Sequence, residues 1–523
     1  MSQDTEFQKT PLTHNDYDFA VRPATSLRNL GLVALLGGFI PDERLFYPER
    51  GDGLKVVDIG GGPGFQSNSH AFCYPGAQFT TIDHNPELSQ SARTLKTSFG
   101  HENVTVHEGS LNSFNEANDD EHDVIISYDT YGQMLEEDRP GVFDTVEDLK
   151  DGGLVLFSYN CAVFNAQFEP FRAFIKLFAD TPHSDQIAQT KSALHLMQEL
   201  VGEEAGYFSQ HLIADRFKRS AYAGARKVFQ EFLNVEWDSF YVHDIMPEFL
   251  SRSFRLCGDA AHLNNAKAQA LPPSMVERLN RYPNRIVSET LYDFSVNRSH
   301  RTDLYIKNRD KVPHSEIIDF WADGQLMLRT KRENIEMQRK FRLNENLRLN
   351  PVKFNPIFDA LAAGPEKFGQ LRKLFPQGPE GDIEMMDIIR IGQALGYLNL
   401  YYGEDLFDDH DQAVLDYDRG LTGWLEQTKA PAHHLFLPYF GEFHPVPPAL
   451  YALAVSAREG GDKNLEDRAS ALLQDILKAQ VEAGVVGGDG SIDNARERIQ
   501  NVRQRFENGL RPMLDKGGYF RAW

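Results

Sequence analysis

Cysteine, long apolar runs and basic charge are all scarce in this chain of 523 residues. Its three cysteines, Cys73, Cys161 and Cys257, lie far apart and offer neither a disulfide framework nor the spacing of a zinc site. No apolar run reaches about 18 residues, so we expect no membrane-spanning helix. The first residues lack a basic segment followed by an apolar one, so we expect no secretory signal. These features predict a cytoplasmic protein.

The charge balance argues against nucleic acid as a partner. Acidic residues outnumber basic ones by 76 to 54, which gives a formal net charge of −22. A surface of this sign repels phosphate backbones unless a local basic face exists. Basic density occurs near residues 285–311 but is interrupted by acids, so we interpret it as a solvated face.

Histidines gather at one place in the chain. His433, His434 and His444 lie within twelve residues, His433 to His444. Adjacent histidines point in different directions, and no cysteine or pair of carboxylates completes a ligand set. We therefore expect no metal site.

The length predicts two to four domains, because one core rarely serves so many residues. Strand-like and helix-like segments alternate up to about residue 165, with strands expected at 54–60, 77–83, 103–110, 122–129 and 154–160. Helices are expected between them, notably over 86–100 and around 139–150. This order predicts an α/β fold with a Rossmann-like parallel sheet that binds ligands at the carboxyl ends of its strands.

The pattern after residue 165 is mostly helical, with strand-like segments returning at 303–307 and 324–330. We expect the sheet domain to be followed by mainly helical accessory domains. The expected divisions are a sheet domain over 1–165, a mostly helical domain over 166–310, a helical or winged-helix-like domain over 311–400 and a C-terminal helical domain over 401–523.

One glycine-rich segment carries the strongest functional signal. The stretch from Asp58 to Gly64 reads DIGGGPG, with glycine at positions 60, 62 and 64. Gly60, Gly62 and Gly64 remove Cβ atoms where the chain turns sharply and where a ligand comes close. Asp83 ends the next strand, nineteen residues beyond Gly64, where a carboxylate accepts hydrogen bonds from ribose hydroxyls. Together these residues predict a site for a nucleoside.

The spacing resembles motif I of class I methyltransferases that use S-adenosyl-L-methionine (SAM). Pro63 lacks one backbone N–H that would cradle a pyrophosphate, although NAD remains an alternative ligand. The resemblance implies that SAM binds the glycine turn, Asp83 and its neighbour His84. Ser110 and Leu111, after the third strand, would meet the adenine. An acidic residue is usual at the position of Ser110.

Two further segments resemble a bacterial family of methyltransferases with an attached methyltransferase regulatory domain. Some members of this family are lysine methyltransferases of outer-membrane proteins. Tyr159 and Asn160, at the end of the fifth strand, match the family pattern Y-N-T-x-P-G-W, whose other positions differ here. Tyr131 matches a tyrosine after the fourth strand, where Tyr128 and Asp129 depart from the family. The resemblance implies that these five residues border the methyl acceptor, with Tyr128 also near the cofactor.

The resemblance continues downstream and spans about residues 15 to 310. The family's N-R-x-F-R-x-x-L segment is matched by Asn297, Arg298, Arg301 and Leu304. This match implies a regulatory and dimerisation role for residues 166–310, and hence a homodimer.

Three functions remain open at this point. The first is methylation of a protein, most simply a lysine, with S-adenosyl-L-homocysteine as the product. The second is methylation of a small molecule at N, O or S, which the altered segment after Asn160 favours. The third is a regulatory protein that binds SAM without turnover.

Overall fold

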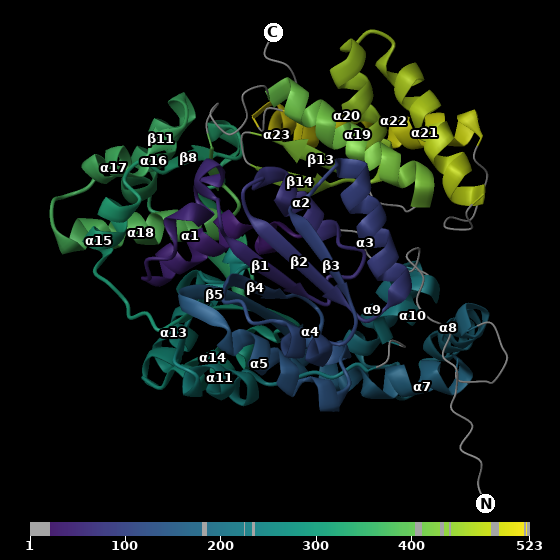
Figure 1. Ribbon diagram of the computed structural model, residues 1–523, viewed down its shortest axis with the longest axis horizontal. Helices are drawn as coiled ribbons and strands as arrows, with labels where there is room; N and C mark the ends of the chain where they lie inside the picture. Colours follow the sequence, from purple (N-terminus) through teal and green to yellow (C-terminus); the bar gives the residue numbers. More distant parts are fainter. Residues whose placement is uncertain are drawn as a thin grey trace, which may run out of the picture.

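A seven-stranded sheet forms the centre of the molecule (Figure 1). The structure is a computed structural model that describes residues 21–179, 186–223, 225–232, 236–402, 410–428, 433–438, 441–482, 491–516 and 519. The strand order is β3-β2-β1-β4-β5-β7-β6. The strands are β1 (Lys55–Ile59), β2 (Gln78–Asp83), β3 (Val104–Glu108), β4 (His122–Ser127), β5 (Leu149–Asn160), β6 (Phe254–Asp259) and β7 (His300–Lys307). The first five are parallel, whereas β7 is antiparallel to both β5 and β6.

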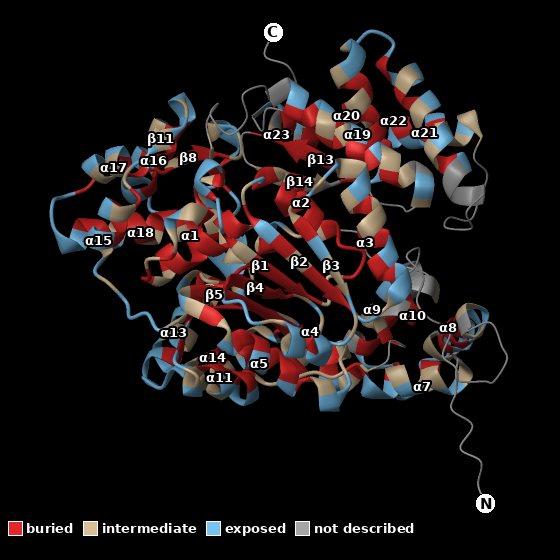
Figure 2. Ribbon diagram, in the orientation of Figure 1, coloured by how far each residue is buried: buried red, intermediate tan, exposed pale blue. Residues whose placement is uncertain are grey.

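The central strands form because their β-branched and apolar residues are buried on both faces of the sheet. Alternate residues belong to separate hydrophobic clusters: Val56 faces one cluster, and Val57 and Ile59 face the other. Figure 2 shows the strands largely buried and the exposed residues concentrated on the outer sides of the helices. The Rossmann-like sheet predicted from the sequence is confirmed.

Helices cover both faces of this sheet. The first cluster includes residues of α1 (Leu27–Gly37), α2 (Phe65–Cys73) and α3 (Pro86–Phe99). The second includes residues of α4 (Leu111–Ala117), α5 (Pro140–Glu147) and α11 (Val242–Ser251). The side chain of Asn85 caps the start of α3, and Gly100 ends it in the left-handed conformation, with φ 70°.

The chain after residue 165 contributes two strands to the sheet. β7 extends the expected segment 303–307 back to His300, and β6 lies at the sheet edge where no strand was expected. The other elements up to residue 296 are helices: α6 (Ala162–Asn165), α7 (Glu169–Ala179), α8 (Gln186–Gly202), α9 (His211–Ala223), α10 (Ala225–Phe232), α12 (Lys267–Ala270), α13 (Pro273–Asn280) and α14 (Arg285–Val296). Pairing with β7 fixes β6, because its sequence FRLCGD has little strand character of its own.

A second, smaller core follows. It holds a three-stranded sheet of β11 (Glu366–Lys367), β8 (Gln325–Leu328) and β12 (Leu398–Tyr401), and the hairpin of β9 (Gln338–Phe341) and β10 (Asn344–Arg348). Helices α15 (His314–Phe320), α16 (Pro351–Ala363), α17 (Phe368–Leu371) and α18 (Pro379–Ala394) pack around these strands. The strand predicted over 324–330 is confirmed as β8.

The C-terminal part packs against the sheet domain. It comprises α19 (His410–Thr428), β13 (His434–Leu437), β14 (Glu442–Pro445), α20 (Pro448–Gly460), α21 (Leu465–Glu482), α22 (Ile492–Arg505) and α23 (Arg511–Lys516). Helix α19 lies beside α3 (Figure 1), and the ring of Tyr417 contacts those of Phe72 and Phe99 at 5.6 and 5.3 Å. No helix among the described residues is both long and apolar enough to cross a membrane.

Candidate functional site

The glycine turn after β1 has a backbone shape that only glycine adopts freely. Gly60, Gly62 and Gly64 have φ values of 67°, 55° and 69°, in the left-handed region. A Cβ on Gly60 would lie 2.4 Å from the Thr130 side chain, and one on Gly64 would lie 2.6 Å from Ala92 Cβ. The turn therefore needs glycine for its conformation and for close packing against its neighbours.

Asp83 is held in place at the end of β2 by two backbone donors. Its Oδ2 accepts the Gly62 N–H at 2.9 Å, and its Oδ1 accepts the Asn85 N–H at 2.9 Å. The residue is 6% exposed, and burial raises the pKa of its carboxyl. Each carboxylate oxygen can accept a second hydrogen bond, so the group suits the two hydroxyls of a ribose. The exposed His84 lies next to it, with Nδ1 4.0 Å from Asp83 Oδ1.

Asp58 lies beneath the turn and is almost fully buried. Ser67 Oγ donates to its Oδ2 at 3.0 Å, and a Cβ on Gly61 would lie 3.0 Å from the same oxygen. Burial, together with the charge of Asp83, raises the pKa of Asp58 to about 7. A cationic ligand group near this carboxyl would stabilise its ionised form. The donor set therefore fits a nucleoside whose other end is positively charged, as in SAM.

Residues after β3 form the start of α4. The Ser110 side chain caps this helix, accepting the Ser113 N–H at 3.1 Å, and Leu111 is buried in the cluster that includes Ile59 and Ile82. Ser110 and Leu111 thus lie at the carboxyl edge of the sheet, on the same side as Asp83.

The loop after β4 is tied to the strands on both sides of it. Asp129 has a φ of 56°, and its N–H donates to Ser158 Oγ on β5 at 2.6 Å. Thr130 Oγ1 donates to the carbonyl of Ile59 at the end of β1, at 3.1 Å. A left-handed aspartate that its neighbours hold in place is a feature found at functional sites. Tyr128 is half-buried in the same loop.

His300 is a residue of this edge that the sequence reasoning missed. Because β7 runs antiparallel to β5, its first residue, His300, pairs with Asn160, the last residue of β5. His300 Nε2 lies 3.3 Å from Asp129 Oδ1, and its ring centroid is 5.9 Å from that of Tyr128. Burial lowers the pKa of His300, although Asp129 opposes this shift. In the sequence, His300 is a histidine just before an expected strand. That position indicates no function until the pairing of β7 with β5 is known.

Tyr131 and Tyr159 pack in the interior. The Tyr131 ring contacts those of Phe157 and Phe240 at 4.8 and 5.0 Å. Tyr159 is 1% exposed, and its hydroxyl donates to Asp303 Oδ2 at 3.4 Å. Their roles toward an acceptor remain predictions, as does that of the partly exposed Asn160.

The comparisons with known proteins agree with this geometry. A family model described as "Methyltransferase domain" matches residues 50–207, and one described as "Predicted methyltransferase regulatory domain" matches residues 225–307. An uncharacterized protein of Synechocystis, sll1526, is 24% identical over 62% of this chain, and RP789 of Rickettsia prowazekii is 22% identical over 49%. The matched regions span 65% and 47% of those two proteins.

The solved structures show the same fold over nearly the whole chain. PKMT2 from Rickettsia typhi matches with a TM-score of 0.61 at 15% identity, covering 96% of this chain and 99% of PKMT2. The structure of PKMT2 in complex with AdoHcy matches with a TM-score of 0.63. Residues 50–207 therefore match a methyltransferase domain and lie in a Rossmann-like fold, and residues 225–307 match a methyltransferase regulatory domain.

Proposed function

We propose that the protein transfers the methyl group of SAM to the Nζ atom of a lysine in another protein, leaving S-adenosyl-L-homocysteine. The observation that carries this proposal is the similarity to PKMT2, a protein lysine methyltransferase by its name, over 96% of this chain. A likeness restricted to the Rossmann-like sheet would fit many methyltransferases. Here it includes the accessory regions, which are the parts that distinguish one methyltransferase from another.

The residues of the glycine turn hold the cofactor in this proposal. Asp83 accepts hydrogen bonds from the ribose hydroxyls, and the turn lets the backbone approach the amino-acid end of SAM. Asp58 stabilises the positive charge near that end, directly or through water. SAM supplies a reactive methyl group on a sulfonium, and the protein's task is to orient the acceptor in line with it.

The Asp129–His300 pair is suited to handle the acceptor's proton. A lysine ammonium has a pKa of about 10.4 and must lose a proton before its nitrogen can attack. Since burial lowers the pKa of His300, its imidazole is neutral at neutral pH and can accept that proton. Asp129, 3.3 Å away, stabilises the resulting imidazolium. The pair lies at the carboxyl edge of β4 and β5, next to the glycine turn.

We also propose that the protein acts as a homodimer in the cytoplasm. Exposed apolar side chains in the region after residue 165 support an interface there, with Leu177 on α7 75% exposed and Phe294 on α14 57% exposed. Light scattering that gives the mass of one chain at working concentrations would contradict the dimer.

Labelled SAM tests the proposed reaction. The full chain is incubated with methyl-labelled SAM and, separately, with the protein and metabolite fractions of a bacterial extract. We expect label on protein, at lysine, and none with an Asp83→Ala variant. Label found only in metabolites would favour the small-molecule methyltransferase. Binding of SAM without transfer to either fraction would favour a regulatory SAM-binding protein.

A further inference from the structure

A pocket lies where the regulatory-domain segment, residues 225–307, meets the smaller core. It has a volume of about 700 Å³, in the range of small-molecule sites. Its walls come from α1, β6, α12, α14, the segment after β7 and α18. None of the cofactor-site residues Asp58, Gly60 to Gly64 or Asp83 lines it. The pocket is therefore separate from the glycine turn.

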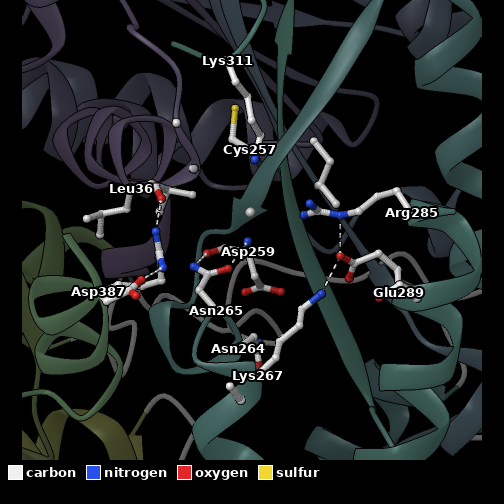
Figure 3. A pocket seen from close by; sticks show the side chains of 18 of the residues that line it. Leu36, Cys257, Asp259, Asn264, Asn265, Lys267, Arg285, Glu289, Lys311 and Asp387 are labelled. Atoms are coloured by element: carbon white, nitrogen blue, oxygen red, sulfur yellow. Dashed lines mark hydrogen bonds and ion pairs between the residues drawn. The ribbon is translucent and has the colours of Figure 1, made fainter. Parts of the chain in front are cut away.

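Cationic side chains from different elements converge on this pocket. Arg285 comes from α14, Lys311 from the segment after β7, and Arg390 from α18. Figure 3 shows Lys311 and Arg285 reaching toward the same space from different sides. Arg390 is anchored by Asp387 and by the Leu36 carbonyl, to which its Nη2 donates at 2.9 Å.

The acidic residues of the pocket leave this charge only partly neutralised. Glu289 accepts from Lys267 Nζ at 2.5 Å, from Arg285 Nε at 2.8 Å and from Arg301 Nη2 at 3.1 Å, so three cations share one carboxylate. Burial would raise the pKa of Glu289, but these cations hold it well below its usual range. The pocket is thus electropositive within a strongly acidic protein.

Of the three cations, Lys311 has its positive charge least neutralised by nearby carboxylates. Among the described residues it forms no ion pair with a carboxylate, and its Nζ lies 5.6 Å from the centre of the Phe39 ring. Burial lowers the pKa of Lys311, and the nearby charges of Arg285 and Arg390 lower it further. Arg285 shares Glu289 with two other cations and Arg390 pairs with Asp387, so the repulsion among the three cations is only partly offset, and a negatively charged ligand would reduce it further.

We propose that this pocket binds a small polyvalent anion, a metabolite carrying phosphate or carboxylate groups, through Lys311, Arg285 and Arg390. The guanidinium of Arg285 contacts Glu289 only through Nε among the described residues, so its terminal nitrogens can form a fork with two ligand oxygens. Because the three cations belong to α14, α18 and the segment between β7 and α15, the anion would join the regulatory-domain segment to the smaller core.

Titration calorimetry of the full chain tests this site without any methyl acceptor. Pyrophosphate and citrate serve as separate probes at physiological salt. A probe should give a saturable one-site isotherm if the pocket accepts its phosphate or carboxylate groups. Lys311→Met should weaken binding about tenfold or more, the effect of a lost charge-assisted hydrogen bond. Lys331→Met is the matched control, since Lys331 is an exposed lysine outside the pocket.

Binding of pyrophosphate alone supports a phosphorylated ligand, and binding of citrate alone supports a carboxylate ligand. Arg285→Gln should weaken the same probe, and circular dichroism shows whether each variant is folded. No saturable binding of either probe in the millimolar range would overturn the proposal. Equal affinity of the Lys311→Met and Lys331→Met variants would overturn it as well.

Discussion

Asp83→Ala is the substitution with the most direct consequence for cofactor binding. In the proposed complex with SAM, the variant loses two charge-assisted hydrogen bonds to the ribose, each contributing about 1.5–3 kcal/mol. A total near 3 kcal/mol corresponds to an affinity loss of roughly 10²-fold. At a SAM concentration of about 100 Kd the wild type gains ~2.7 kcal/mol of stability, whereas the variant at the same concentration gains only ~0.4 kcal/mol.

Thermal unfolding with and without SAM measures this difference. Each variant is compared with its own SAM-free form, because Asp83 also accepts the N–H groups of Gly62 and Asn85 and its loss destabilises the turn itself. Glu87→Ala is the control, an exposed carboxylate four residues away on α3. Undiminished SAM stabilisation of Asp83→Ala, or stabilisation of the wild type by NAD and not by SAM, would refute the reasoning.

Three other predictions concern the same edge of the sheet. The pKa of Asp58 is about 7 in the folded chain against 3.8 unfolded, so the native state holds an extra proton between these values. Stability should therefore fall as pH rises from about 4 to about 7, and Asp58→Asn should flatten urea-unfolding free energies over that range; an unchanged slope would contradict the assignment. His300→Ala should slow methylation by about 10²-fold or more with SAM affinity retained, and Asp129→Asn should lower the pH at which the rate rises; wild-type pH–rate profiles for both would exclude the pair. Tyr159→Leu, which removes the ring, and Asn160→Ala, which removes the amide, should each lower turnover about 10²-fold in steady-state assays with SAM affinity nearly intact; wild-type rates in both would place the acceptor elsewhere.

The shape of the glycine turn, where we propose that the cofactor binds, could be predicted from sequence because its signals are local. A buried apolar strand, alternating glycines and a carboxylate at the end of the next strand are all visible within thirty residues. The structure gives these features their physical reasons: left-handed backbone at Gly60, Gly62 and Gly64, and a hydrogen bond from Gly62 to Asp83.

The remaining features depend on contacts between distant segments. β6 forms only by pairing with β7, and His300 reaches Asp129 only because β7 lies antiparallel to β5. The basic residues near 285–311 were interpreted as a solvated face. This interpretation is wrong for Arg298 and Arg301, which are only 4% and 1% exposed. Buried carboxylates balance both guanidinium groups: Arg298 donates to Asp259, and Arg301 donates to Asp293, Asp303 and Glu289.

Mass spectrometry of the methylated product tests the central claim most directly. The full chain is incubated with deuteromethyl SAM and bacterial proteins, and the labelled peptides are sequenced, with Asp83→Ala as the inactive control. The account predicts deuteromethyl groups on lysine side chains that appear only with the wild type. Labelled peptides whose methyl groups lie on residues other than lysine, or equal labelling by the Asp83→Ala variant, would contradict it.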